Sequence, residues 1–337
     1  MADRIRLRSR PLACAVVLLA SVALSATAQA QSKHYSFGYD QPHTTGYGVV
    51  GDVFNAKLME LSHGTMQIDQ FPGAQLGQEP QMLQKIQTGD IDFIISSTAN
   101  AATVAPESGV LSLHYIFKSE AHMIKALANP ALTKAVGAMF AEKVHGAHVI
   151  TMATLGLRDM YAKKPIRTLA DMKGLKVRVQ ATATEDATFP VYGSQTVHMP
   201  FGSVYTSLQT GVMDVAENGV NVYLANKHYE VAPVLSMTEH EANCSVVWVS
   251  DKLWNSLTAE QQGWVQAAAD EVARVEPAKA IELEHDSAAK LKKIGVQVIT
   301  DVKKDEFIAV AKPLQDKLAA ELGPNAVKIL AVVRASE

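Results

Sequence analysis

Residues 79–95 read EPQMLQKIQTGDIDFII, and the pattern of this stretch decides the fold class. Its first part, EPQMLQKIQTG, has apolar residues at helical spacing and ends at Gly89, a residue that commonly terminates helices. The second part, IDFII (91–95), is a short apolar run typical of a buried strand. A helix followed directly by a buried strand indicates a parallel sheet covered by helices.

The same alternation extends in both directions from this stretch. Upstream, we expect strands at 34–39 and 65–71 and an amphipathic helix at 46–61, which completes a βαβαβ unit. A second set runs from about Gly156 to His240. Its expected strands are LRDMYA (157–162), LKVRV (175–179) and MDVAE (213–217), and its expected helices lie near 184–192 and 204–211.

The C-terminal part differs from these two sets. A long helical pattern covers 258–293, where Thr258 can cap the helix and Pro277 is expected to bend it. One more strand (296–300) and one more helix (304–321) follow. The predicted fold class is α/β, with two lobes that are joined by a hinge and face each other across a cleft.

The N-terminus has the three parts of a secretory signal peptide. Four arginines between residues 4 and 10 precede an apolar run (12–24), and a small-residue site predicts cleavage after Ala30. The apolar run is too short for a stable membrane anchor. We therefore expect a signal peptide at residues 1–30 and a soluble protein exported to a bacterial periplasm.

The composition of the mature chain excludes several classes of partner and site. Cleavage removes four arginines and one aspartate, so the net charge of −3 becomes −6, which argues against nucleic acid and anionic membranes as partners. It also removes Cys14, and the remaining Cys244 excludes an internal disulfide. Cys244 precedes the apparent strand SVVWVS (245–250) and is expected to pack in the core.

The motifs that suggest catalysis or a cofactor are weak. GYGVVG (46–51) matches a dinucleotide-binding pattern, but Pro42 ends the preceding strand too early, so the glycines are expected to permit close helix packing instead. The eleven histidines form no metal motif, and EHE (239–241) lacks ligand spacing on a helix. Glu217 and Glu241 could form an acid–base pair, although the sequence cannot place them together. We expect no cofactor, metal or catalytic residue.

Polar residues do gather at the C-terminal ends of the predicted strands, where open α/β sheets bind ligands. Two arginines together with neutral and acidic hydrogen-bonding residues suit a carboxylate that also bears hydroxyl groups. These residues are Glu79, Ser97, Arg158, Arg178, Gln180 and Asn218.

The chain resembles the substrate-binding proteins of tripartite ATP-independent periplasmic (TRAP) transporters, the extracytoplasmic solute receptors, over essentially its whole mature length. The stretches that carry the resemblance are FPGAQLGQEPQMLQKIQTGDIDF (71–93), GLRDMYAKKPIRTLADMKGLKVRVQ (156–180), MPFGSVYTSLQTGVMDVAEN (199–218) and KHYEVAP (227–233). The family fold implied is a two-lobe clamshell with a long helix that spans both lobes. Lobe I would comprise 31–155 plus 244–283, and lobe II 156–243 plus 284–337.

The resemblance also implies roles for individual residues. Arg178 matches the arginine that forms a bidentate salt bridge with the substrate carboxylate, Arg158 a supporting arginine, and Asn218 an asparagine that contacts the carboxylate. Glu79 and Ser97 match first-lobe positions that vary with the ligand. Two departures stand out, because Gln180 and Gly219 occupy positions where the family commonly has proline.

The expected ligand is an organic acid, either a sugar acid such as a hexuronate or a four-carbon dicarboxylate. A dicarboxylate would need a second cationic group in the first lobe, where no arginine or lysine is apparent and Glu79 would repel it. A sugar acid would use as hydroxyl partners His43, Glu79, Ser97, Thr98, Gln180 and Asn221. The implied partners are the small and large integral membrane permease subunits. An exported hydrolase is the alternative of another class.

Overall fold

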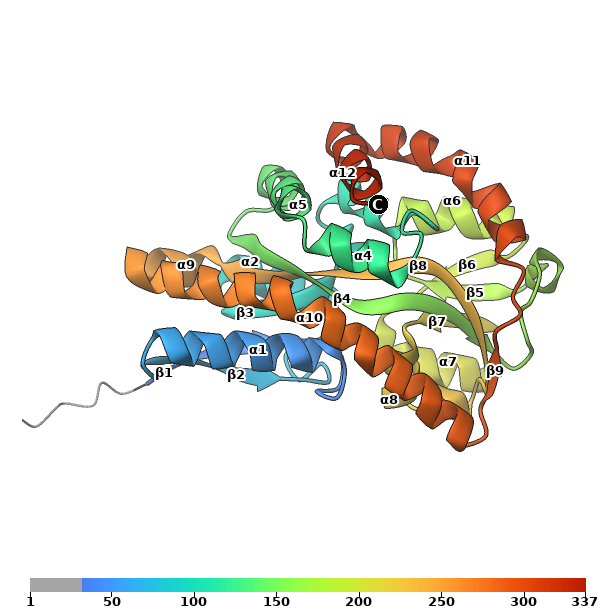
Figure 1. The fold of residues 1–337 in the computed structure, drawn as a ribbon, viewed down its shortest axis with the longest axis horizontal. Helices are drawn as coiled ribbons and strands as arrows, with labels where there is room; N and C mark the ends of the chain where they lie inside the picture. Colours follow the sequence, from blue (N-terminus) through green and yellow to red (C-terminus); the bar gives the residue numbers. More distant parts are fainter. Residues whose placement is uncertain (1–31) are drawn as a thin grey trace, which may run out of the picture. The chain divides into compact units, whose positions relative to one another are not determined.

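The alternation predicted for residues 34–95 is present in the structure, a computed structural model that describes residues 32–337 (Figure 1). The predicted signal peptide, residues 1–30, lies outside the described residues. The first set of elements comprises β1 (Lys33–Gly38), α1 (Gly46–Leu61), β2 (Met66–Phe71), α2 (Glu79–Thr88) and β3 (Phe93–Ser97).

Helices not predicted from the sequence follow this set and lead into a long strand. They are the short α3 (Thr98–Ala101), the 3₁₀ helix η1 (Pro106–Ser112), α4 (Glu120–Leu127) and α5 (Pro130–Lys143), before β4 (Ala147–Ala162). The second set then comprises η2 (Leu169–Met172), β5 (Lys176–Val179), α6 (Ala183–Val191), β6 (Gln195–His198), η3 (Phe201–Ser203), α7 (Val204–Thr210), β7 (Val215–Asn218), α8 (Val220–Ala225) and η4 (His228–Glu230).

The remaining elements begin with a second long strand. They are β8 (Val234–Ser250), α9 (Asp251–Ser256), α10 (Ala259–Lys293), β9 (Gln297–Ile299), α11 (Lys304–Leu322) and α12 (Pro324–Ala335). The structure corrects one prediction here, because Cys244 lies inside β8 rather than before it. It is buried, in agreement with the expected core position.

The strands form one mixed sheet of nine strands rather than a purely parallel one. Its order is β2-β1-β3-β8-β4-β7-β5-β6, and β9 pairs with β8. Strands β1, β2 and β3 are parallel to one another, as are β5, β6 and β7, in agreement with the predicted βαβ units. Between these groups, the long strands β8 and β4 pair antiparallel with each other, β8 also pairs antiparallel with β3 and β4 with β7, and β9 pairs parallel with β8. Both sets therefore share a single sheet.

The core lies on both faces of this sheet, and alternate residues of β8 contribute to each face. Trp248 packs against Phe140 of α5 with a ring-centroid distance of 4.6 Å. Val247 and Val249 belong to the opposite cluster, which includes Phe54 of α1 and Val265 of α10. The two apolar clusters fix the register of β8 at the middle of the sheet.

Helix α10 connects the two sets of elements, as the family resemblance implied (Figure 1). It packs against α1 near its start and against α8 near its end. Two buried glutamates anchor it: Glu276 accepts a hydrogen bond from the Thr154 backbone N–H (3.2 Å), and Glu284 accepts one from the Asn221 N–H (2.9 Å). The helix continues through Pro277.

The glycines of GYGVVG lie within α1, as predicted. A Cβ atom at Gly48 would come within 1.8 Å of the His43 carbonyl oxygen. The glycine therefore permits the close approach of the preceding turn, which is a structural role.

Within residues 32–337, no helix is long and apolar enough to cross a membrane. These residues form one compact unit, so the division into lobes at 155, 243 and 283 stays a prediction.

Candidate functional site

A small cavity forms where polar ends of strands from both sets meet. Its volume is about 20 Å³. The residues that line this central cavity are Asp40, Gln41, Tyr47, Glu79, Ser97, Asn100, Leu155, Arg158, Arg178, Gln180, Phe201, Asn218 and Asn243. Six of the nine predicted site residues are therefore brought together: Glu79, Ser97, Arg158, Arg178, Gln180 and Asn218.

Arg178 is a buried cation on β5, with only 2% of its surface exposed. Its Nε and Nη2 atoms both donate to the Met199 carbonyl oxygen, at 3.1 and 2.9 Å. Its guanidinium carbon lies 5.9 Å from the centre of the Phe201 ring, within the range of a cation–π contact. Arg178 forms no ion pair with any residue of the described range 32–337, so an anion in the central cavity would supply the missing charge partner.

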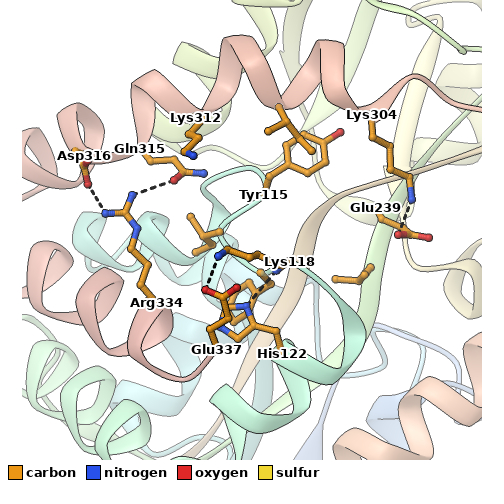
Figure 2. Close-up of a pocket in the computed structure, with 14 residues that line it drawn as sticks. Tyr115, Lys118, His122, Glu239, Lys304, Lys312, Gln315, Asp316, Arg334 and Glu337 are labelled. Carbon is orange, nitrogen blue, oxygen red and sulfur yellow. Dashed lines mark hydrogen bonds and ion pairs between the residues drawn. The ribbon is translucent and has the colours of Figure 1, made fainter.

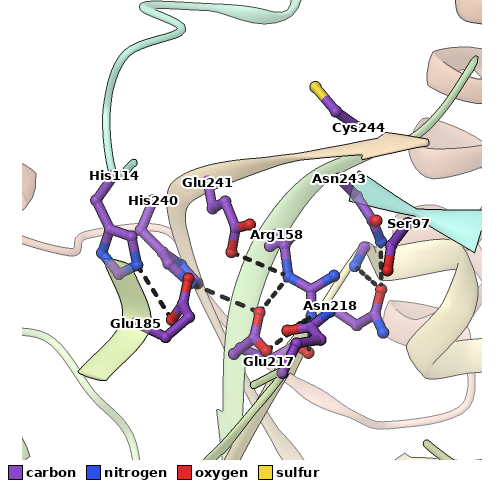
Figure 3. Close-up of polar contacts among 12 residues, drawn as sticks. Ser97, His114, Arg158, Glu185, Glu217, Asn218, His240, Glu241, Asn243 and Cys244 are labelled. Carbon is purple, nitrogen blue, oxygen red and sulfur yellow. Dashed lines mark hydrogen bonds and ion pairs between the residues drawn. The ribbon is translucent and has the colours of Figure 1, made fainter. Parts of the chain in front are cut away.

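Arg158 on β4 is also buried but already has a partner, as Figure 3 shows. Its Nε atom donates to Glu217 Oε2, and its Nη2 atom donates to Glu217 Oε1 (2.7 Å). Nη2 also donates to the Glu217 backbone carbonyl oxygen (3.0 Å). Burial alone would raise the pKa of Glu217, but Arg158 lowers it to about 2. Arg158 therefore holds a carboxylate of the protein and can contribute only part of its hydrogen-bonding capacity to a ligand.

The first set of elements contributes carboxyl groups to the opposite side of the cavity. Glu79 at the start of α2 accepts hydrogen bonds from the Ser97 N–H and hydroxyl (both 2.9 Å), from Asn100 Nδ2 (2.8 Å) and from the Tyr47 hydroxyl (3.3 Å). Asp40 lies beside it, and burial, followed by the Glu79 charge, raises the pKa of Asp40 well above its ordinary value. A protonated Asp40 would be both a donor and an acceptor.

Asn218 ends β7 beside the two arginines. Its Oδ1 atom accepts from Asn243 Nδ2 (2.8 Å) and from the Gly219 N–H (2.9 Å). These bonds orient the Asn218 amide so that its nitrogen remains available to the cavity.

Three predicted hydroxyl partners lie outside the central cavity, because their polar atoms are engaged elsewhere. The His43 ring, which is half exposed, contacts Asp52 (3.1 Å). The Thr98 hydroxyl donates to the Cys244 carbonyl oxygen (3.1 Å), and the Asn221 side chain donates to the Ser287 hydroxyl (3.1 Å). These three residues were predicted only as hydroxyl partners of a sugar acid, and that role stays a prediction, whereas all six residues selected at strand ends line the cavity.

The model of the bacterial extracellular solute-binding protein family 7 matches residues 38–322. The chain belongs to this family. The proteins similar to it are solute-binding proteins of TRAP transporters, so this chain is a TRAP solute receptor. A receptor of this kind binds its ligand and is not an enzyme.

The TRAP receptor is similar to several proteins with known ligands. The 2,3-diketo-L-gulonate-binding periplasmic protein of Escherichia coli is 28% identical over 320 residues, which is 94% of this chain and 96% of the relative. A TRAP periplasmic solute-binding protein from Xanthobacter autotrophicus, solved with bound β-D-galacturonate, is 30% identical with a TM-score of 0.82, and the match covers 90% and 100% of the two chains. One from Pseudomonas putida with bound D-glucuronate is 28% identical with a TM-score of 0.82, over 88% and 96%.

Gln180 and Gly219, the two positions that depart from the family pattern, lie in different surroundings in this receptor. Gln180 lines the cavity beside Arg158. Gly219 is the N-cap of α8, where a Cβ atom would come within 2.2 Å of the Leu155 carbonyl oxygen. The close approach of β4 to this turn therefore excludes a proline at position 219 unless the backbone moves.

Several residues that line the cavity were not predicted from the sequence. Asp40 and Gln41 follow β1 and could have been found by the same strand-end argument that selected Ser97. Phe201 and Tyr47 carried no such signal, because an aromatic residue near a helix start is usually part of the core. Asn243 was missed because β8 was predicted to begin only after it.

Behind Arg158, the receptor buries further titratable groups (Figure 3). Glu241 Oε2 lies 3.4 Å from Arg158 Nε. His240 Nε2 lies 3.7 Å from Glu217 Oε2, and His114 Nε2 lies 3.5 Å from Glu185 Oε2. Burial lowers the pKa of His114 to about 3 and that of His240 to about 4. Both rings are therefore neutral at physiological pH.

Proposed function

We propose that this receptor captures a sugar acid, such as a glucuronate or galacturonate, in the periplasm and delivers it to its membrane permease subunits. The observation that carries the proposal is the buried Arg178, which has no carboxylate partner within residues 32–337 and adjoins the central cavity. A guanidinium fork matches a carboxylate in a bidentate arrangement, and burial strengthens that pair.

The opposite wall favours hydroxyl groups over a second carboxylate. Both cations among the lining residues, Arg158 on β4 and Arg178 on β5, lie outside the first set of elements, and Glu217 already neutralises Arg158. The first set presents Glu79 and Asp40 instead. A four-carbon dicarboxylate would place its second negative charge against Glu79, whereas sugar hydroxyls can donate to it.

The cavities that could hold the ligand suit an extended molecule and a receptor that changes its shape on binding. The central cavity, at about 20 Å³, has room for about one water molecule. A neighbouring cavity of about 270 Å³ shares Asp40 and Phe201 with it and is also lined by Gln78 and Gly202. The Gly202 N–H donates to Gln78 Oε1 (3.1 Å), and we infer that this contact between the two sets opens when the ligand enters.

Two further parts of the proposal rest on the family. Export would follow from the predicted signal peptide and from the periplasmic location stated for relatives. Delivery would involve the small and large permease subunits of a TRAP system. The similar structures with galacturonate and glucuronate support the choice of a sugar acid over other organic acids.

Isothermal titration calorimetry of the mature receptor can test the ligand class. The panel should include D-galacturonate, D-glucuronate, D-galactonate, succinate and malate. We expect saturable one-to-one binding of a sugar acid and weaker binding of both dicarboxylates. Tighter binding of succinate or malate would contradict the sugar-acid proposal.

A further inference from the structure

A second polar centre lies away from the central cavity, on the far side of Arg158 (Figure 3). It brings together His114, which follows η1, with His240 and Glu241 of β8. One ligand-type atom from each of these three residues lies within 4.8 Å of the others. All three residues are buried, and Glu185 of α6 adjoins them, with its Oε2 atom 3.5 Å from His114 Nε2.

The inward-facing atoms of this centre form no hydrogen bond within residues 32–337, although both histidine Nε2 atoms face a carboxylate oxygen at 3.5 and 3.7 Å and Glu241 Oε2 faces Arg158 Nε at 3.4 Å. They are His114 Nε2, His240 Nε2, Glu241 Oε2 and both carboxylate oxygens of Glu185. Leaving a buried polar atom unpaired costs about 1–3 kcal/mol, so this many unpaired atoms at one point require an explanation.

The outward-facing nitrogens of both imidazoles, by contrast, are paired. His114 Nδ1 lies 2.8 Å from the Tyr192 hydroxyl, and His240 Nδ1 lies 2.8 Å from the Thr238 hydroxyl. A proton on each Nδ1, donated to its hydroxyl partner, leaves each Nε2 with a free lone pair that faces the centre. An outer hydrogen bond of this kind is what orients metal-binding histidines.

The buried charges at this point also do not balance. Among residues 32–337, Arg158 is the single arginine or lysine in an ion pair with this group of carboxyls, so ionisation of Glu185, Glu217 and Glu241 together would leave an excess of two negative charges in these pairs. Buried charge must be compensated. Two bound protons or one divalent cation would do this, and a cation would in addition bind the lone pairs of both Nε2 atoms.

We propose that His114, His240 and Glu241 bind one divalent transition-metal ion of the zinc type, with Glu185 as an adjoining fourth ligand. Two neutral imidazole nitrogens and carboxylate oxygens are a donor set that suits Zn²⁺, and four such ligands make a closed structural site. The ion would neutralise the two carboxylates behind Arg158 and so hold Arg158 and Glu217 in place beside the central cavity.

A route to this centre begins at a cavity of about 660 Å³, shown in Figure 2. Its lining includes Tyr115 and Glu239, the chain neighbours of His114 and His240. Both neighbours have positive φ angles, 59° for Tyr115 and 43° for Glu239, an unfavourable backbone conformation for residues other than glycine. The Tyr115 N–H donates to the His240 carbonyl oxygen (2.7 Å), so the two segments that carry the histidines are joined beside this cavity.

Metal binding can be measured on the untagged mature receptor after treatment with a chelator. We expect Zn²⁺ titration to saturate at one ion per chain and Co²⁺ to produce the visible absorption of a low-symmetry, four-coordinate site. Ligand-replacing variants His114→Gln and Glu241→Gln should abolish both signals. His34→Gln should retain them, because His34 is half exposed and pairs with Asp69 of β2, in the first set of elements.

A second variant tests the geometry without removing a ligand. Tyr192→Phe deletes only the hydroxyl that contacts His114 Nδ1, and it should weaken Zn²⁺ binding about 10- to 100-fold while the fold is retained. Absence of stoichiometric Zn²⁺ and of the Co²⁺ spectrum in the wild-type receptor would overturn the proposal and assign the charge balance to protons. Signals that survive His114→Gln in a folded variant would also overturn it. None of these outcomes depends on sugar-acid binding, so this proposal and the proposed function can fail separately.

Discussion

At the scale of single residues, the site shows that two buried arginines of the same sheet can have different tasks. Arg158 and Arg178 are both nearly inaccessible, but only Arg158 has a carboxylate partner among the described residues. The sequence indicated both as cavity residues because each lies near the end of a strand. It could not show which one is neutralised, since Glu217 lies 59 residues from Arg158 along the chain.

Replacement of Arg178 tests the proposed salt bridge. Arg178→Lys retains a charge but loses the planar pair of donors, so it should weaken sugar-acid binding almost as much as Arg178→Ala. Removal of one partner of a desolvated charge pair costs about 2–5 kcal/mol, or roughly thirty-fold to several thousand-fold in affinity. Calorimetry should detect this loss, and circular dichroism should show an unchanged fold.

Arg167→Lys is a matched control for this pair of variants, because Arg167 is exposed and pairs with Asp301 far from the cavity. The affinity of the Arg167→Lys variant for the sugar acid should equal that of the wild type. Wild-type affinity in both Arg178 variants would show that Arg178 does not bind the ligand carboxylate.

Asp40 offers a second test at this scale. Because burial and Glu79 raise its pKa, Asp40→Asn should retain a neutral donor and acceptor and should change the affinity for a sugar acid by less than about tenfold, or 1.4 kcal/mol. Glu79→Gln should weaken the same ligand more, since it replaces an acceptor of four hydrogen bonds. Titrations at pH 7 with one uronate would compare the two variants, and the reverse order would contradict this assignment.

At the scale of elements, local periodicity predicted most of the strands in residues 32–337 but only half of the α-helices, and within β8 it failed where buried residues are polar. Strand β8 covers Val234–Ser250, yet only its apolar end, 245–250, was predicted. Its first part, MTEHEAN (237–243), resembles a loop in sequence because its polar side chains belong to the centre behind Arg158 and to the cavity. A strand that carries a functional site loses the apolar pattern by which strands are predicted.

Helix α10 depends on its two buried glutamates for its attachment to other elements. Glu284 accepts hydrogen bonds from the N–H groups of Val220 and Asn221 at the start of α8. Glu284→Ala would leave both donors buried and unpaired and should lower the free energy of unfolding by about 1–3 kcal/mol. Chemical denaturation of the mature protein would measure this difference.

Glu282→Ala is the control, because Glu282 lies exposed on the same helix two residues away. It should change the free energy of unfolding by less than about 0.5 kcal/mol. Equal effects of the two substitutions would mean that the Glu284 contacts do not stabilise the attachment of α10 to α8.

At the scale of the whole molecule, stability should depend on pH through buried carboxyl groups. Burial raises the pKa of Asp159 to about 8, from an ordinary value of 3.8. The folded state therefore binds a proton that the unfolded state releases between these two values, and this contribution to stability is present below pH 4 and is lost as the pH rises toward 8. Asp159→Asn should reduce the fall in unfolding free energy between pH 5 and pH 8.

The substitution preserves the acceptor for the Glu239 N–H, which contacts Asp159 Oδ1 at 2.9 Å. Denaturation curves of the wild type and the variant at both pH values would isolate Asp159 from the other buried acids. The same pH dependence in both proteins would mean that Asp159 is ionised in the fold.

The pairing of strands across the whole sheet was the feature least predictable from the sequence. Patterns within about 60 residues predicted both parallel groups, but the antiparallel pairing of β8 with β3 and β4 leaves no local trace. The two α/β sets already indicated two lobes, and the family resemblance added the long helix that spans both. The charges gathered behind Arg158 were missed for the same reason, since His114 and His240 are 126 positions apart.

The position of β8 in the sheet has a consequence for the order of assembly. Residues 93–97 of β3 find their antiparallel partners only at 245–249, so a chain that is still emerging cannot complete its sheet until roughly three quarters of it has been synthesised. Until then, β3 presents a bare apolar edge to which other chains can add. The central sheet must therefore close late, and these early strands need protection from aggregation until the last third of the chain arrives.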